Sequence, residues 1–435
     1  MSIMKIKQFH FLTIFLLIFI SLSSCSGLRQ KATSRDINIL LRKSVVFKNQ
    51  FTGFVLYDPS TKKVVKERNG QLLFTPASNT KILTAYTVLK TLKDSIPTFI
   101  SKLENDTIFI QPLGDPTFLH PDFKEQQAWS KLLNHPLKVS MPDKQFEHFG
   151  TGWAWDDYQY DFQQERSLFP VYGNEVRITR KEDSLQIFPP FFRNFVSLNQ
   201  PEEIRPLPYR SEHSNIFNVP VEDDTSQFTR TIPFKTSEEL PGVLLEDTLK
   251  NSVSLSKIQL LDGDTIYNYH LLPVLATMMQ RSDNFLAEQL LIVSSQSVGN
   301  QNLDQFRNQT LSELNLPTKI RWVDGSGLSR YNLISPISMV KVLEEIYQMA
   351  SWEEITSIFP NGGVSGTIRK WYGWSEPYVF AKTGTLSNNH ALSGFIKTRS
   401  GRILIFSIMN NHYIRPVNEV KLEMQTLLEL IRDGY

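Results

Sequence analysis

Three short groups of residues in this chain have the types and the order that serine acyl transfer needs. They are Ser78 with Lys81, Ser282 with Asn284, and the run that begins at Lys382. A serine hydroxyl is a poor nucleophile until a base removes its proton. Ser78 and Lys81 stand at positions i and i+3, so on a helix they share one face within a single turn. The spacing predicts a nucleophile paired with a lysine base.

Each group is common by chance when taken alone, and its context selects the copy that matters. Other copies of Ser-x-x-Lys or Ser-x-Asn begin at Ser60, Ser197, Ser254, Ser338 and Ser387. Only Ser78 opens a helical pattern whose next two turns are apolar, as a buried nucleophile helix requires. Ser282–Asn284 joins two apolar helical segments, and Lys382 introduces a pair of strands. The joint pattern predicts a catalytic site, whereas each residue by itself is more simply a helix cap, a loop residue or a surface lysine.

The base and the oxyanion donors have specific physical requirements. Lys81 can accept a proton only when its amine is neutral, so its pKa must fall below the usual value of about 10.4. Burial would lower that pKa, and so would a second cation such as Lys382 nearby. Ser78 near a helix N-terminus gains backbone N–H groups that stabilise the oxyanion of a tetrahedral intermediate. The N–H of Thr385, on a strand edge, is the expected second donor.

The remaining residues of the three groups are expected to handle the substrate. Ser282 is placed to relay a proton to the departing amine. Lys382 is expected to stay charged and to hold a terminal carboxylate, which points to a carboxypeptidase. An asparagine amide both donates and accepts hydrogen bonds with a peptide backbone. The predicted substrate-binding residues are Asn284, Lys382, Thr383, Gly384 and Thr385.

The order of apolar patterns predicts an α+β domain interrupted by an insertion. A hairpin precedes the Ser78 helix, and helices return from residue 269 before a second hairpin and a C-terminal helix. Between these parts, short apolar runs broken by Pro, Asn and Asp favour a β-rich insertion. The expected segments are a signal peptide (1–24), a tether (25–36), the first part of the main domain (37–93), the insertion (94–250) and its second part (251–435).

The first residues carry an export signal. Lys5 and Lys7 precede the almost unbroken apolar stretch 11–22, which is too short to span a bilayer. The only cysteine, Cys25, follows Leu-Ser-Ser, which resembles a bacterial lipobox. That resemblance implies cleavage before Cys25 and lipid attachment to its sulfur, and multiple acyl chains give stable membrane anchoring. The protein is therefore expected to be exported, periplasmic and anchored to a membrane. A plain signal peptide with an incidental cysteine is the alternative.

Composition excludes several other classes. The 435 residues are 41% hydrophobic, which allows a large core. The formal net charge is +2 and no Lys/Arg-rich run occurs, so nucleic acid is a poor partner. The eight histidines are scattered and no His-Glu-x-x-His is present, so no metal site is expected. The sequence does not fix the oligomeric state.

Beyond the three groups, the chain resembles the type-4 penicillin-binding proteins, the low-molecular-mass class C D-Ala-D-Ala carboxypeptidases and endopeptidases. The resemblance rests on Gly114–Thr117, Gly152–Tyr158, Asp324–Arg330 and Asn361–Thr367. It implies an α+β fold with a penicillin-binding-protein/β-lactamase-like transpeptidase domain and a β-rich domain inserted between the first and second catalytic motifs. It also implies hydrolysis of peptidoglycan stem peptides through a Ser78 acyl-enzyme, covalent inhibition by β-lactam antibiotics, and no cofactor.

The family pattern also suggests a role for Asp157, although a tight turn explains this residue equally well. In relatives the Trp-Asp-Asp segment borders the active site and helps to recognise the side-chain amine of the stem peptide. Asp157 is carried over for that role, with Phe162 five residues further on. The chain departs from the pattern at Leu113, where a further glycine is usual, and in the gap of about two hundred residues between Ser78 and Ser282. The short gap implies that one inserted subdomain is missing.

Three other functions share parts of this pattern. A class A β-lactamase needs a Glu-x-x-Leu-Asn loop, but Leu311 stands where the glutamate would be in front of Leu314-Asn315. Class C β-lactamases and related esterases use Tyr-x-Asn where this chain has Ser282. A non-enzymatic lipoprotein that binds peptidoglycan, or one that is catalytically weak, is the remaining alternative. The presence of all the catalytic side chains together argues against it. Whether the enzyme trims terminal D-Ala, cuts cross-links or does both stays open.

Overall fold

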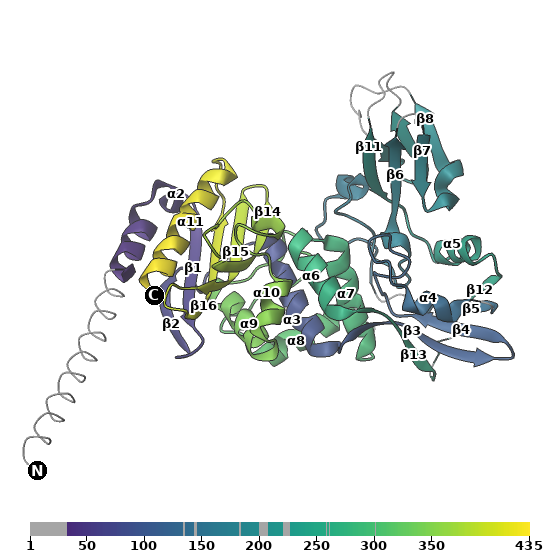
Figure 1. Cartoon of the computed structure of the whole chain (residues 1–435), viewed down its shortest axis with the longest axis horizontal. Helices are drawn as coiled ribbons and strands as arrows, with labels where there is room; N and C mark the ends of the chain where they lie inside the picture. Colours follow the sequence, from purple (N-terminus) through teal and green to yellow (C-terminus); the bar gives the residue numbers. More distant parts are fainter. Residues whose placement is uncertain are drawn as a thin grey trace, which may run out of the picture.

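The computed structural model describes residues 33–435 except 134, 143–145, 182–183, 200–207, 221–226, 258, 261 and 301. Its two regions are a catalytic domain, built from both ends of the chain, and an inserted region (Figure 1). Cys25 and the predicted signal peptide lie outside the described residues. Among the residues that are described, no helix combines the length and the apolar character that crossing a membrane requires.

A five-stranded antiparallel sheet forms the centre of the catalytic domain. The strand order is β14-β15-β16-β1-β2, so the first strand of the chain pairs with the last (Figure 1). Nearly every residue of β15 and β16 is buried, because helices cover both faces of the sheet. The strands are β1 (Phe51–Asp58), β2 (Lys63–Arg68), β14 (Val379–Leu386), β15 (Asn389–Lys397) and β16 (Ile403–Asn411).

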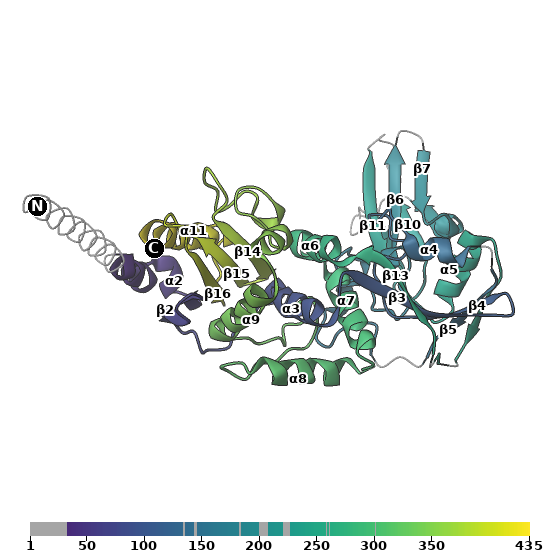
Figure 2. The same ribbon diagram turned by 60° about the horizontal axis from the view of Figure 1, so that its bottom comes forward.

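The two faces of this sheet have different helical covers. The C-terminal helix α11 (Val417–Gly434) and the helix over residues 33–43 pack on one face through Val420, Met424 and Ile37. The helix over residues 33–43 thus starts inside the segment 25–36, which was predicted to be a tether. The other face packs on a helical layer. That layer contains α3 (Lys81–Thr91), α6 (Leu271–Arg281), α7 (Asn284–Ser297), α8 (Leu303–Leu314), α9 (Pro336–Met349) and α10 (Trp352–Ile358). Figure 2 shows α8 at the outer side of this layer.

The inserted region has its own hydrophobic core, separate from that of the catalytic domain. Its larger sheet has the order β12-β5-β4-β3-β13, and two three-stranded sheets have the orders β11-β6-β7 and β8-β10-β9. Two helices, α4 (Gln127–Leu132) and α5 (Leu240–Leu249), pack against them. The strands are β3 (Ser95–Glu104), β4 (Thr107–Pro112), β5 (Leu137–Ser140), β6 (Glu175–Lys181), β7 (Ser184–Phe188), β8 (Val196–Asn199), β9 (Tyr209–Arg210), β10 (Phe217–Pro220), β11 (Phe228–Pro233), β12 (Val253–Ser256) and β13 (Asp264–His270).

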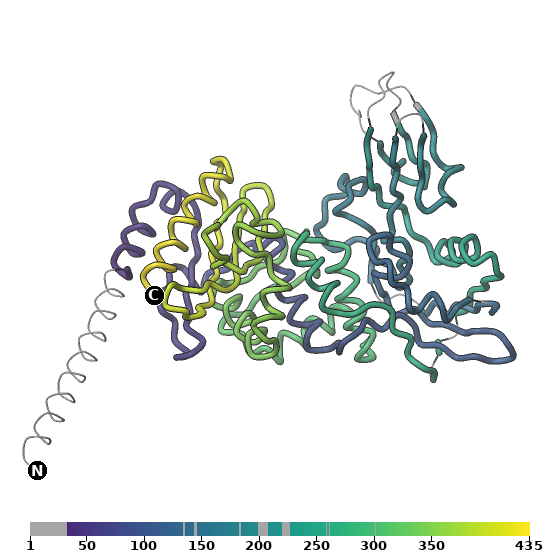
Figure 3. The backbone as a smooth tube through the Cα atoms, in the orientation of Figure 1, coloured from purple at the N-terminus to yellow at the C-terminus, as the bar shows by residue number. Residues whose placement is uncertain are grey.

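The predicted boundary at residues 250/251 falls inside the larger sheet and is corrected to residue 270. β12 pairs with β5, and β13 returns along β3, with Asp264 opposite Ser101 and His270 opposite Ser95. β12 has only four residues and both strands are largely exposed, so neither contains the longer apolar run that marks a strand in the sequence. Figure 3 shows the chain leaving the catalytic domain after α3 and re-entering it at α6.

Candidate active site

Ser78 lies on a tight turn whose position is fixed by glycine. It belongs to η1, a 3₁₀ turn over Ala77–Thr80 that leads directly into α3. Asn79 Nδ2 donates to the carbonyl of Lys382 at 2.8 Å and so ties the turn to β14. A Cβ on Gly384 would come within 2.2 Å of the Pro76 carbonyl oxygen. Only glycine therefore allows the strand to pack this closely behind the nucleophile.

Lys81 lies beside Ser78, within hydrogen-bond distance of its hydroxyl. Its fully buried Nζ lies 3.2 Å from Ser78 Oγ and donates to Asn284 Oδ1 at 2.5 Å and to the Ser326 carbonyl at 2.7 Å. As an ammonium, Nζ donates to all three oxygens; in the neutral form it can keep its two N–H groups on Asn284 and Ser326 and direct its lone pair at Ser78 Oγ. Burial lowers the pKa of Lys81 to about 8, against the opposing effect of nearby carboxylates.

Ser282 and Asn284 lie where two helices join. Ser282 ends α6 in the left-handed conformation, with φ 61°, and Asp283 caps α7 by accepting from Leu286 N at 2.8 Å. Asn284 is then the first residue of α7, and its Nδ2 donates to the Phe162 carbonyl at 2.8 Å. The turn directs Ser282 Oγ to Lys382 Nζ, 2.8 Å away. The second group of the sequence therefore meets both lysines.

Lys382 differs from Lys81 in its charged neighbours. Its side chain is fully buried, and its Nζ donates to Ser282 Oγ and to the Thr383 carbonyl, each at 2.8 Å. Burial and the positive charge of Lys81 lower the pKa of Lys382 well below its usual value. The expected charge on Lys382 therefore depends on a carboxylate brought by a ligand, which would raise that pKa again.

The two threonines of β14 make separate hydrogen bonds at the edge of the site. Thr383 Oγ1 donates to Thr367 Oγ1 at 2.8 Å, in the glycine-rich segment identified from the sequence. Thr385 Oγ1 pairs with His390 Nδ1, also at 2.8 Å. Burial lowers the pKa of His390 to about 3, so this imidazole is neutral at pH 7. The hydroxyl groups are thus oriented by neutral partners.

A cleft of about 360 Å³ opens in front of Ser78. Its size is at the lower end of the range for small-molecule sites. Asp157, on η2 (Trp155–Gln159) of the inserted region, lines this cleft, and burial together with Asp156 raises the pKa of its carboxyl group. The predicted residues Ser78, Asn284, Thr385 and Asp157 therefore share one cavity, and Phe162 lines it too. Further lining residues that the sequence prediction missed are Gln163, Leu328, Arg330, Leu386 and Ser387.

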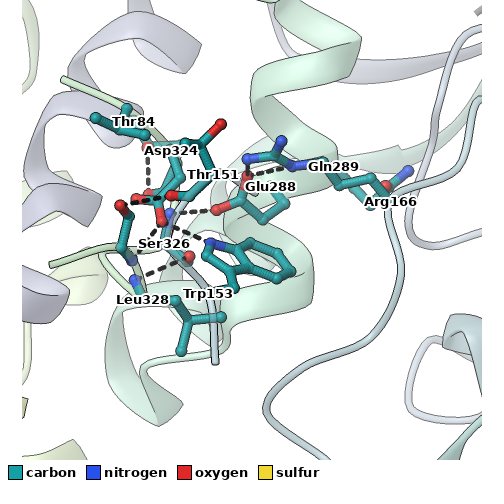
Figure 4. A network of polar contacts seen from close by, with 12 residues as sticks. Thr84, Thr151, Trp153, Arg166, Glu288, Gln289, Asp324, Ser326 and Leu328 are labelled. Carbon is teal, nitrogen blue, oxygen red and sulfur yellow. Dashed lines mark hydrogen bonds and ion pairs between the residues drawn. The ribbon is translucent and has the colours of Figure 1, made fainter. Parts of the chain in front are cut away.

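The segment Asp324–Arg330 is a loop that lines this cleft with Gly327, Leu328 and Arg330. Figure 4 shows the polar contacts around Asp324. Asp324 accepts hydrogen bonds from the backbone N–H groups of Gly327 and Ser329, at 2.9 and 2.7 Å, and from Trp153 Nε1 at 2.8 Å. Gly327 has φ +87°, and a Cβ there would come within 2.0 Å of the Ala77 carbonyl oxygen. The loop and β14 therefore confine the Ser78 turn from two sides.

A half-buried serine beside a buried lysine, a second serine bonded to a second lysine, and a strand edge at the cleft define a serine acyl-transfer enzyme. The sequence profile of the D-Ala-D-Ala carboxypeptidase 3 (S13) family matches residues 35–182 and 248–430. The chain belongs to this family of serine-type D-Ala-D-Ala carboxypeptidases. The unmatched stretch, 183–247, lies within the inserted region.

Individual relatives agree with this assignment. D-alanyl-D-alanine carboxypeptidase DacB of Haemophilus influenzae is 32% identical over 173 residues, 37% of this chain but only 36% of that protein. A D-alanyl-D-alanine carboxypeptidase of an Actinomadura species is 26% identical over 454 aligned positions, covering 91% of this chain and 84% of that protein. The crystal structure of penicillin-binding protein 4 from Haemophilus influenzae superposes with a TM-score of 0.70 at 20% identity, over 91% of this chain and 99% of that one. A structure of the same protein with a β-lactam gives a TM-score of 0.66 at 19% identity, over 92% and 99% of the two chains. The predicted fold class, a penicillin-binding-protein-like α+β domain, is thereby confirmed.

Proposed function

We propose that this enzyme hydrolyses the terminal D-Ala-D-Ala bond of peptidoglycan stem peptides through an acyl-enzyme on Ser78. The observation that carries the proposal is the position of Lys81 Nζ, 3.2 Å from Ser78 Oγ and held by two oxygen acceptors. Such preorganisation allows the amine to accept the hydroxyl proton without rearrangement. The names of the relatives, which are carboxypeptidases, support the same substrate class.

In the acylation step, Lys81 takes the proton of Ser78 as Oγ attacks the carbonyl carbon of the penultimate D-Ala. The carbonyl oxygen becomes an oxyanion, for which the backbone N–H groups of Ser78 and Thr385 are the proposed donors. The C–N bond then breaks, and Ser282 relays the proton held by Lys81 to the departing amine of the terminal D-Ala, which returns both side chains to their starting states. Water hydrolyses the resulting ester, which regenerates Ser78.

Lys382 and the threonines of β14 are proposed to bind the free carboxylate of the terminal D-Ala. A carboxylate would supply the negative charge that Lys382 lacks among the described residues, since no acidic side chain lowers the cost of its burial. Asn284 would hold the peptide backbone, and Asp157, on the other side of the cleft, would accept a hydrogen bond from a side-chain amine of the stem peptide. A β-lactam presents a carboxylate and a reactive amide at similar positions, so we propose that it acylates Ser78. The β-lactam complex of the Haemophilus relative supports this.

Labelling with a fluorescent penicillin tests the proposed acyl-enzyme. The wild type is expected to be labelled stoichiometrically and the Ser78→Ala variant not at all, because no other hydroxyl lies within reach of Lys81 Nζ among the described residues. Mass spectrometry of a digest should place the adduct on the peptide that contains Ser78. Equal labelling of the two proteins would remove Ser78 from the mechanism.

The products formed from purified muropeptides distinguish the remaining functions. Release of single D-Ala residues would identify a carboxypeptidase, and conversion of cross-linked dimers to monomers would identify an endopeptidase. Unchanged muropeptides after stoichiometric penicillin labelling would identify a peptidoglycan-binding protein that acylates but does not turn over. We expect release of D-Ala, because Thr385 of the proposed carboxylate site lines the same cleft as Ser78.

We further propose that the protein is exported and held on a membrane by lipid attached to Cys25. The basic start, the apolar stretch and the Leu-Ser-Ser-Cys sequence at residues 22–25 support this proposal. A periplasmic location would bring the active site to its peptidoglycan substrate. Membrane fractionation of a Cys25→Ser variant tests the anchor.

A further inference from the structure

One of the two acceptors that hold Lys81 is itself held by a buried carboxylate. The Ser326 carbonyl accepts from Lys81 Nζ at 2.7 Å, while the backbone N–H of the same residue donates to Glu288 Oε1 at 2.7 Å (Figure 4). The hydrogen bond between Ser326 N and Glu288 involves no residue of the three sequence motifs. Glu288 thus holds the backbone N–H of the residue whose carbonyl holds one N–H of Lys81.

Glu288 reaches this position because of its place on α7. It follows Asn284 by four residues, so the two side chains lie on one face of the helix, one turn apart. Asn284 Oδ1 contacts Lys81 Nζ directly, and Glu288 contacts the loop that carries Ser326. Only 2% of Glu288 is exposed, and a carboxylate this buried requires a compensating partner.

The partner is Arg166, which belongs to the inserted region. Its Nε and Nη2 donate to Glu288 Oε2 at 2.8 and 2.6 Å, and its guanidinium lies over the ring of Trp153, 5.1 Å from the ring centroid. Trp153 in turn donates to Asp324 at 2.8 Å (Figure 4). Arg166 is itself 6% exposed, so the pair is shielded from solvent and its charges are strongly coupled.

We propose that Glu288 is a positioning residue for the base, Lys81, and that Arg166 of the inserted region holds Glu288 in place. The inference rests on the proposed function, in which Lys81 activates Ser78. It gives the inserted region a role in acylation in addition to lining the cleft, because the ion pair connects it to the base through a single residue, Ser326. The pair acts through Ser326 and touches neither the substrate nor the reacting atoms.

The charged groups that face Lys81 determine whether replacing Glu288 raises or lowers the pKa of Lys81. Asp283 before α7, Glu288 on α7 and Asp324 in the loop each favour the ammonium form, and Lys382 on β14 opposes it. A glutamine at position 288 keeps an oxygen acceptor for Ser326 N and removes one negative charge. The pKa of Lys81 should therefore fall, and the acid limb of the acylation rate should move to lower pH, because acylation needs the neutral amine.

The test is the pH dependence of penicillin acylation of the full-length protein. For Glu288→Gln we expect the acid limb to shift down by about one pH unit, with a plateau rate within threefold of the wild type. Glu288→Ala removes the acceptor as well, and its plateau rate should fall at least tenfold. Arg166→Met should lower the plateau at least fivefold, and Arg166→Lys, which keeps the charge, should recover most of the loss.

Gln289→Leu is the matched control. Gln289 is the next residue of α7, is fully buried, and clamps the inserted region by accepting from Ser167 N and donating to the Ser167 and Gly114 carbonyls. It has no contact with the Lys81 network, so its variant should lose thermal stability without changing the pH profile. An unshifted or upward-shifted limb in Glu288→Gln would overturn the inference. So would a rate loss in Gln289→Leu equal to that in Glu288→Ala. A wild type that is not acylated at all would overturn the proposed function instead.

Discussion

At the scale of single residues, the proposed mechanism requires one active-site lysine to be neutral and the other to be charged when a substrate is bound. Lys81 must be neutral to take a proton from Ser78, and Lys382 must be charged to attract a carboxylate. In the free protein the carboxylates lie around Lys81, while burial strongly disfavours the charge on Lys382. A substrate carboxylate reverses this preference, because it raises the pKa of Lys382 and the new ammonium then lowers that of Lys81. Binding of the correct substrate therefore helps to generate the base.

This argument predicts that Lys382 contributes to the chemical step as well as to binding. Lys382→Ala should reduce kcat/KM for a D-Ala-D-Ala peptide roughly 30- to 1000-fold, which corresponds to a loss of about 2–4 kcal/mol of transition-state stabilisation. Part of this loss should appear in kcat. Wild-type enzyme acting on the C-terminally amidated peptide should show a similar loss. The two losses should not add, since each removes the same ion pair. Unchanged kcat/KM in Lys382→Ala, with the fold intact by circular dichroism, would contradict this role.

At the scale of elements, the turn that carries Ser78 is fixed by two close backbone approaches. Gly327 of the loop packs closely against the Ala77 carbonyl on one side of the turn. Gly384 of β14 packs closely against the Pro76 carbonyl on the other side. Neither approach tolerates a Cβ. The position of Ser78 Oγ relative to Lys81 therefore depends on glycines that make no polar contact with the substrate.

Gly327→Ala should slow penicillin acylation at least tenfold, because the added methyl displaces the Ala77–Ser78 peptide. Gly401→Ala is the control, since Gly401 has the same φ of +87° but a Cβ added there would meet nothing within 4 Å. Both variants carry the strain of a left-handed alanine, about 1 kcal/mol. Only the first should lose activity. The measurement is the stopped-flow acylation rate of each variant, together with its melting temperature. If the two variants melt at the same temperature and only Gly327→Ala is slow, displacement of the Ser78 turn, and not general backbone strain, causes the loss.

The sequence predicted the elements around the site better than the contacts within it. Apolar periodicity located α3, α6, α7 and the hairpin β15–β16, because these elements bury one face or both. It did not locate β12 and β13, because β12 alternates over only four residues and both strands are largely exposed. The three motifs predicted Ser78, Asn284 and Thr385, which line the cleft. Glu288 and Arg166 were missed, because a buried ion pair between segments 122 positions apart has no local pattern.

At the scale of the whole molecule, the inserted region and the catalytic domain form one active site from distant parts of the chain. The inserted region contributes Asp157 to the cleft and Arg166 to the network behind the base. A second ion pair, Asp122 with Arg281 at 2.6 Å, joins the two regions directly before Ser282. These contributions require the inserted region to stay docked on the catalytic domain. Loss of the inserted region should therefore impair catalysis, even though the three motifs lie in the other domain.

The proposed lipid anchor at Cys25 concerns the location of the whole molecule in the cell. If Cys25 is lipidated, the mature protein should sediment with membranes and require detergent for release, because two or more acyl chains bind a bilayer stably. Cys25→Ser should shift the protein to the soluble fraction, with acylation of Ser78 by penicillin unchanged within twofold. Mass spectrometry of the wild-type N-terminal peptide should show the acyl mass on Cys25. A variant that remains in the membrane fraction would show that another part of the molecule provides the attachment.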